Sequence, residues 1–69
     1  MRARALTPLT PMERRLLSLL ALGQSSVQAA AAMRIDPADA EVILADLMKR
    51  HDVLTRQQLL ARAIVHRWI

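Results

Sequence analysis

The stretch Asp36–Arg50, DPADAEVILADLMKR, decides the expected fold, because the rest of the chain is arranged around the helix that it predicts. Asp36 is a residue typical of a helix N-cap, and Pro37 suits the first helical position. Asp39 then lies at the positive end of the helix dipole, where a carboxylate is favoured. The buried side is expected to consist of apolar residues at helical spacing, namely Ala40, Ile43 and Leu47. We therefore expect a helix over residues 37–50.

The opposite side of this helix is acidic at its start and apolar further on. No Lys or Arg occurs between Pro37 and Met48, although the formal net charge of the chain is +4. Such a side suits contact with protein, and the residues expected to bind a partner are Glu41, Val42, Leu44, Ala45 and Met48. The pattern leaves open the alternative that Leu44 and Met48 pack inside the domain or its dimer.

Length and composition favour one small helical domain that spans residues 1–69. A chain of 69 residues buries only about 60% of the surface that its unfolded form exposes. Leu and Ala are abundant, Gly occurs once and Trp68 is the only aromatic residue, which favours an all-α fold. The absence of Cys excludes a disulfide, so we expect the domain to gain stability by forming a homodimer.

Several function classes are not expected from the residues. His51 and His66 are far apart and form no metal-binding pattern, and the chain has neither a nucleophile–base pair nor a Gly-rich phosphate loop. We therefore expect no enzyme activity, no metal and no cofactor. The apolar runs are shorter than the roughly 18 residues of a membrane span, and no continuous apolar core follows Arg2 and Arg4. The expected location is the cytoplasm.

The segments before the central helix predict an arm and two helices. Residues 1–9 are expected to form an extended arm, and Thr10 with Glu13 forms a capping-box pattern that begins a helix over 11–22. Gly23 suits the end of that helix, because glycine adopts a left-handed backbone without penalty. Ser25 with Gln28 repeats the capping-box pattern and begins a short helix over 26–33, whose alanines allow close helix crossing.

The C-terminal segment predicts a last helix over 56–68, which begins with a third capping box at Thr55 and Gln58. At 100° per residue this helix has two apolar sectors, and one of them suffices to close the core. The other sector is expected to form the dimer interface, with the residues Ala61, Ile64, Val65 and Trp68. Simple fraying of the helix end is the alternative.

The order of a helix, a short helix, a turn, a longer helix and a closing helix is that of a helix-turn-helix. Two further patterns are present, Leu9-Thr10-Pro11-x-Glu13 near the start and Val53-x-Thr55-Arg56-x-Gln58-Leu59 near the end. Together they resemble the C-terminal DNA-binding domain of LuxR-type regulators over residues 6–65. This resemblance implies a four-helix LuxR-like fold that dimerises through its last helix.

The departures from this family fall where DNA would be read. The family pattern has Ser, Thr and Lys where this chain has Asp36, Asp39 and Glu41, and it keeps Gly where this chain has Arg34 and Asp52. Phosphate neutralisation supplies much of DNA affinity, and base edges are read by side-chain donors. Carboxylates repel phosphates and do not donate hydrogen bonds to base edges, so we do not expect this helix to bind DNA.

The length and the altered helix also resemble the small quorum-sensing anti-activators of Pseudomonas phages. This resemblance implies an inhibitor that binds a LuxR-type acyl-homoserine-lactone receptor such as LasR and blocks its action. It also implies a second partner, the type IV pilus assembly ATPase. The alternative hypothesis is a small DNA-binding transcriptional regulator that contacts phosphates through five cations, Arg2, Arg4, Arg14, Arg15 and Lys49.

Overall fold

A computed structural model describes residues 9–69, and this part of the chain is all-helical, without a β-strand. The helices are α1 (Pro11–Ala21), α2 (Ser26–Met33), α3 (Pro37–Arg50) and α4 (Arg56–Val65). The expected arm lies almost entirely outside the described residues, but its last residue, Leu9, is buried. No helix among residues 9–69 is long and apolar enough to cross a membrane.

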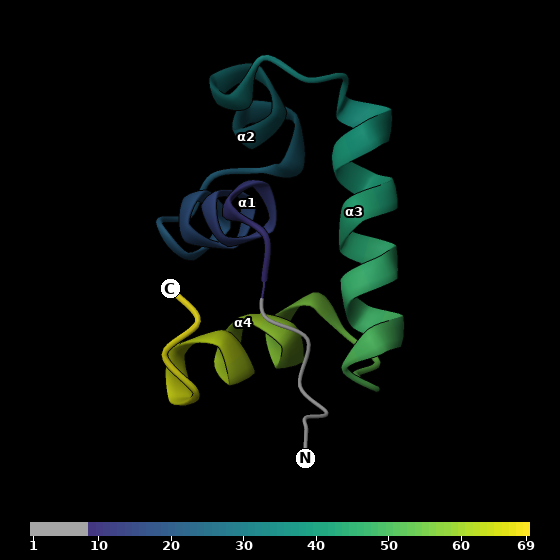
Figure 1. The fold of residues 1–69 in the computed structure, drawn as a ribbon. Coiled ribbons are helices and arrows are strands. Elements are labelled where there is room, and N and C mark those ends of the chain that lie inside the picture. The colour runs from purple at the N-terminus through teal and green to yellow at the C-terminus, as the bar shows by residue number, and fades with distance from the viewer. Residues whose placement is uncertain (1–8) are drawn as a thin grey trace.

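The helices pack around a small aliphatic core. In Figure 1, α3 stands along one side of the molecule, with α2 near one end of it and α4 crossing near the other. α2 packs on α1 and α3, and α4 also packs on α1 and α3. The buried residues are Leu9, Leu16, Leu17, Leu20, Ala29, Ala30, Ala40, Leu44, Leu47, Val53, Leu59 and Ala63. The fully buried alanines of α2 leave room for its neighbours to approach closely.

The first two helices begin with reciprocal capping boxes, as the sequence predicts. The Thr10 hydroxyl accepts a hydrogen bond from the Glu13 amide at 3.1 Å, and the Glu13 carboxylate accepts one from the Thr10 amide at 3.0 Å. Ser25 and Gln28 form the same pair of bonds, at 3.1 and 2.9 Å. Each box satisfies two amides that the helix leaves without an internal partner.

The caps of the other two helices differ from each other. Asp36 accepts a hydrogen bond from the Ala38 amide at 2.9 Å and so caps α3. The Thr55 hydroxyl accepts one from the Gln58 amide at 3.1 Å, as expected. The Gln58 side chain, however, accepts from the Leu54 amide at 2.8 Å instead of from the Thr55 amide. The third capping box is therefore incomplete, and its second half stabilises the preceding turn.

A left-handed residue follows each helix. These residues are Gly23 (φ 96°), Arg34 (φ 60°), Asp52 (φ 54°) and Arg67 (φ 57°). In each case, the next amide donates back to a carbonyl five residues earlier, at distances of 2.8–3.2 Å, which is the Schellman arrangement. Only one of the four positions holds the glycine that this backbone favours. The remaining three positions therefore store a small amount of backbone strain.

The residues that follow three of these left-handed positions turn back onto the core. Val53 is buried, and Ile35 and Trp68 pack against the core while remaining partly exposed. The predicted end of the last helix is consequently wrong. α4 ends at Val65, and the left-handed Arg67 redirects the chain so that Trp68 does not continue the helix.

Candidate functional site

The outward face of α3 consists of the residues that point away from the core along its length. Glu41, Val42 and Ala45 are exposed here, and 67% of the Val42 surface is accessible. At 100° per residue, Val42 lies nearly opposite the buried Ala40, and Glu41 and Ala45 flank it on one side. Three of the five expected partner-binding residues therefore share one accessible surface, which we call the α3 face.

Leu44 does not belong to this face, and its expected placement is wrong. Only 2% of its surface is accessible, because it lies one turn after Ala40 and one turn before Leu47, on the same side of the helix. Met48 lies at the edge of the buried side, where it is partly buried and packs against the core. Ile43, which was expected on the buried side, packs against the core at its other edge and is partly buried. The alternative that Leu44 and Met48 pack inside the domain is the correct one.

Ion pairs within the chain reduce the number of free carboxylates on α3. The Glu41 carboxylate lies 3.3 Å from the guanidinium of Arg56 on α4. The Asp46 carboxylate lies 2.9 Å from the guanidinium of Arg50, one turn along the same helix. Asp39 is exposed and forms no ion pair with another described residue. The α3 face also includes the exposed Asp39 and Asp46. It therefore combines one free carboxylate, two paired carboxylates and the aliphatic side chains of Val42 and Ala45.

A polar cluster joins the ends of α1, α3 and α4. Glu13 uses one carboxylate oxygen in the capping box and the other in an ion pair with Arg50. The Arg62 guanidinium donates a hydrogen bond to the His51 carbonyl oxygen at 2.8 Å. That carbonyl follows the last turn of α3, where the helix leaves acceptors without an internal donor. The three helices are thus connected by charge-assisted bonds at their ends.

Trp68 lies between two imidazole rings at this corner. Its ring centroid is 4.3 Å from that of His51 and 5.7 Å from that of His66. Burial lowers the pKa of His51, and Arg50 and Arg62 lower it further, against an opposing effect of Glu13. The sequence suggests that the α3 dipole favours a charged His51, but the surroundings favour the neutral ring. Ring contacts therefore add to the polar bonds that hold this corner together.

The expected dimer interface is only partly available. Ala61, Ile64 and Val65 are exposed on α4, whereas Trp68 is turned back onto the domain and cannot extend their row. Leu54, which lies in the turn before α4 and is 84% exposed, was missed because it falls outside the helical periodicity. An open groove of about 430 Å³ runs beside this surface and is lined by Asp52, Val53, Leu54, Gln58, Ala61, Arg62, Val65 and His66. We call this the α4 groove.

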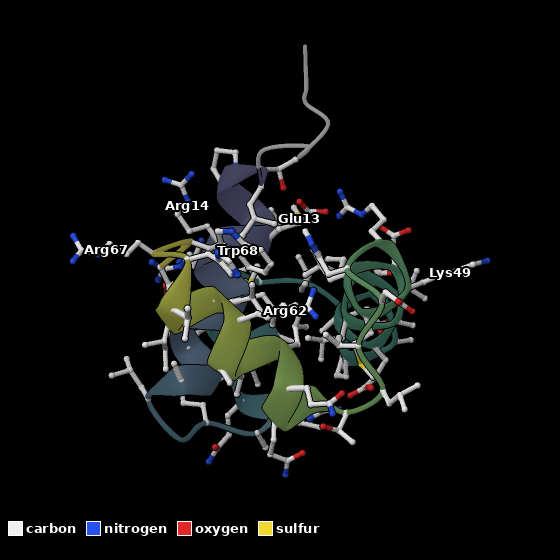
Figure 2. All side chains as sticks on the ribbon, turned by 90° about the horizontal axis from the view of Figure 1, so that it is seen from below. Glu13, Arg14, Lys49, Arg62, Arg67 and Trp68 are labelled. Carbon is white, nitrogen blue, oxygen red and sulfur yellow. The ribbon has the colours of Figure 1, made fainter. Side chains whose placement is uncertain are left out.

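Several of the basic side chains lie on different sides of the domain (Figure 2). Figure 2 shows Arg14, Arg67 and Lys49 pointing away from the body, with Lys49 on the far side from the other two. Arg50 and Arg56, by contrast, are held in ion pairs. Arg2 and Arg4 lie outside the described residues. Arg14 and Lys49, two of the five cations of the DNA-binding alternative, therefore lie on different sides of the molecule (Figure 2).

No group of three or more metal-ligating side chains occurs among residues 9–69. Comparisons with protein-family models, with curated proteins and with solved structures gave no match for this chain.

Proposed function

We propose that this chain is a protein-binding inhibitor with a helix-turn-helix-like scaffold, which captures a LuxR-type activator such as LasR and does not itself bind DNA. The observation that supports this proposal most strongly is the composition of the α3 face. It exposes Asp39, Glu41 and Val42 on the helix that would enter the major groove in a DNA-binding relative. The α3 sequence has no Lys or Arg before Lys49, so this face lacks the donors for phosphates and base edges.

Two backbone angles support the resemblance on which the partner class depends. Arg34 and Asp52 stand where the LuxR-type pattern keeps Gly, and both adopt the left-handed conformation that glycine favours. The backbone requirement of the pattern is thus present although its residues have changed. The same resemblance makes the type IV pilus assembly ATPase a second proposed partner.

In the proposed complex, the α3 face supplies both charge and apolar contact. Asp39 has no partner of its own among the described residues and is available to a basic group. Val42 and Ala45 supply the aliphatic contact that excludes water around such a pair. A basic surface on the activator, such as one that itself binds DNA, fits this combination. Binding there would block the activator without any contact between the inhibitor and the promoter.

We further propose that the chain forms a homodimer through α4. The aliphatic side chains of Ile64 and Val65 are 61% and 73% exposed, and Leu54 extends this surface beyond the helix. Exposed apolar side chains gathered on one surface favour association. Trp68 is not part of this proposed interface, because it packs against its own domain. Sedimentation of Ile64→Arg should show the monomer, and an unchanged dimer would refute the interface.

The inhibitor proposal is tested by binding of the purified activator to the immobilised chain. Glu41→Lys and Val42→Arg should each weaken capture by about tenfold or more, because each places a cation on the face that meets basic groups. Arg56→Gln is the matched control, since it breaks the Glu41 ion pair but keeps the carboxylate. Its binding should remain near that of the unaltered chain. Circular dichroism should show the same helix content in all three variants.

A duplex mobility shift separates this proposal from the alternative regulator. The chain alone should not retard promoter DNA at low salt. Retardation that weakens steeply as salt rises would support the DNA-binding regulator instead. Capture of the activator at unchanged strength by both Glu41→Lys and Val42→Arg would show that the α3 face is not the binding surface.

A further inference from the structure

A second open groove lies between the start of α1 and the end of α2. Its volume is about 330 Å³, and it is lined by Pro11, Met12, Arg15, Ala32, Met33 and Arg34. It shares no lining residue with the α4 groove and none with the α3 face. We call it the α1–α2 groove. Two of its lining residues are methionines, whose unbranched side chains adapt to ligands of different shape.

The charge of this groove has one sign. Arg15 and Arg34 are both exposed, and neither forms a hydrogen bond or ion pair through its side chain with another described residue. No carboxylate lines the groove. Arg50 and Arg56 differ in this respect, because each is held by a carboxylate of its own chain. The two guanidinium groups of the groove are therefore free to receive an external anion.

The backbone at Arg34 is a second feature of this groove. Its φ of 60° is a conformation that costs an L-residue free energy and that glycine adopts readily. The arginine side chain makes no polar bond within residues 9–69 that would offset this cost. The Schellman bond from the Ile35 amide holds this backbone in place. Residues in such a conformation also recur at binding sites.

We propose that the α1–α2 groove binds an acidic segment of a partner protein, in which an aliphatic side chain enters between Met12 and Met33 and flanking carboxylates pair with Arg15 and Arg34. A nucleic acid fits less well, because the groove offers no aromatic ring on which bases stack. The chain's own first residues are also disfavoured as occupants, since they include Arg2 and Arg4, which have the same charge as the groove.

The test uses a synthetic peptide that alternates Leu with Asp and Glu, and a matched peptide in which Lys replaces every acidic residue. Titration of the ¹⁵N-labelled full chain should shift the amide signals of Met12, Arg15, Met33 and Arg34 with the acidic peptide only. Arg34→Gly and Arg15→Gln should each weaken binding about two- to fivefold, as expected for exposed ion pairs. Arg34→Gly relieves the left-handed strain, so its weaker binding would not result from unfolding. Higher salt should weaken binding further.

Arg14→Gln is the control, because Arg14 is the neighbouring exposed arginine on α1 and does not line the groove. It removes the same charge as Arg15→Gln and should leave peptide affinity unchanged. Any of four results would overturn the proposal. The first is no binding of the acidic peptide at about 1 mM, and the second is binding of the Lys peptide with the same affinity. The third is an equal loss of peptide affinity in Arg14→Gln and Arg15→Gln. The fourth is that single-stranded RNA competes for the groove more tightly than the acidic peptide does. Removal of residues 1–8 tests whether the chain itself is the occupant. If the removal shifts the amide signals of the groove residues, and the acidic peptide then binds without competition, the chain's own first segment occupies the groove. This result would also refute the proposal.

Discussion

Replacing Arg34 by glycine should make the domain more stable, because it removes the strain of a left-handed backbone at the end of α2. This conformation costs an L-residue about 1–2 kcal/mol. Relief of this strain raises the free energy of unfolding. The new glycine also increases the entropy of the unfolded chain, which lowers the free energy of unfolding by about 0.4–1 kcal/mol. No intramolecular polar bond of the Arg34 side chain is lost within the described residues. The middle values of these two ranges leave a net gain of about 0.8 kcal/mol.

Thermal unfolding followed by circular dichroism at 222 nm measures this gain. A domain of this size changes its Tm by about 4–8 °C per kcal/mol, so Arg34→Gly should unfold about 3–6 °C higher. Urea unfolding should show a higher midpoint with an unchanged slope, which would exclude a change in the surface exposed on unfolding. Dimer dissociation would add to the unfolding free energy, so all variants are compared at one protein concentration.

Two control variants separate backbone strain from charge. Arg34→Ala removes the same positive charge but keeps the Cβ atom, so its Tm should stay close to that of the unaltered chain. Gly23→Ala makes the reverse change at the end of α1. A Cβ atom there would meet nothing within 4 Å, so only the φ of 96° opposes it, and the loss should be about 1 kcal/mol. A Tm of Arg34→Gly that equals or falls below that of Arg34→Ala would refute the reasoning.

Three further predictions concern the core and the polar corner. Leu44→Ala should lower the free energy of unfolding in urea by about 2–5 kcal/mol, because Leu44 is buried. Val42→Ala should lower it by less than about 0.5 kcal/mol, because Val42 is exposed. Equal losses would contradict the buried position of Leu44. Glu13→Ala should cost about 1–2 kcal/mol, because the Glu13 carboxylate no longer accepts from the Thr10 amide or pairs with Arg50; a loss below about 0.5 would show that these bonds contribute little. The pKa of His51 is lowered from 6.5, so its stabilising effect is present above pH 6.5 and is lost as the pH falls through the folded-state value. His51→Gln should remove this part of the acid sensitivity; an unchanged pH profile would refute it.

Local sequence signals sufficed for the helix starts and most of the helix ends. Capping residues such as Thr10 and Ser25 act on amides two or three positions away, so their effect is contained in a short stretch of sequence. The expected ranges 26–33 and 37–50 coincide with α2 and α3. The last helix was extended too far because neither Gly nor Pro marks its end. Arg67 adopts the left-handed conformation there instead.

The composition of the candidate site was less predictable, because it depends on packing between distant segments. Apolar residues surround most of α3, so periodicity alone did not decide whether Ile43 or Leu44 lies nearest the core. The packing of the neighbouring helices determines that Leu44 is the buried one. The ion pair between Glu41 and Arg56 joins residues 15 positions apart on different helices, and no local pattern predicts it. For the same reason the sequence suggested a more acidic α3 face than the one observed.

The position of Trp68 has a practical consequence for experiments on this protein. It is the only indole in the chain, and it contacts one imidazole from the end of α3 and another from the end of α4. Its emission therefore reports on the closure of a single junction, without interference from other fluorophores of its kind. Intrinsic fluorescence thus records, without any added label, whether this corner opens when a ligand binds elsewhere.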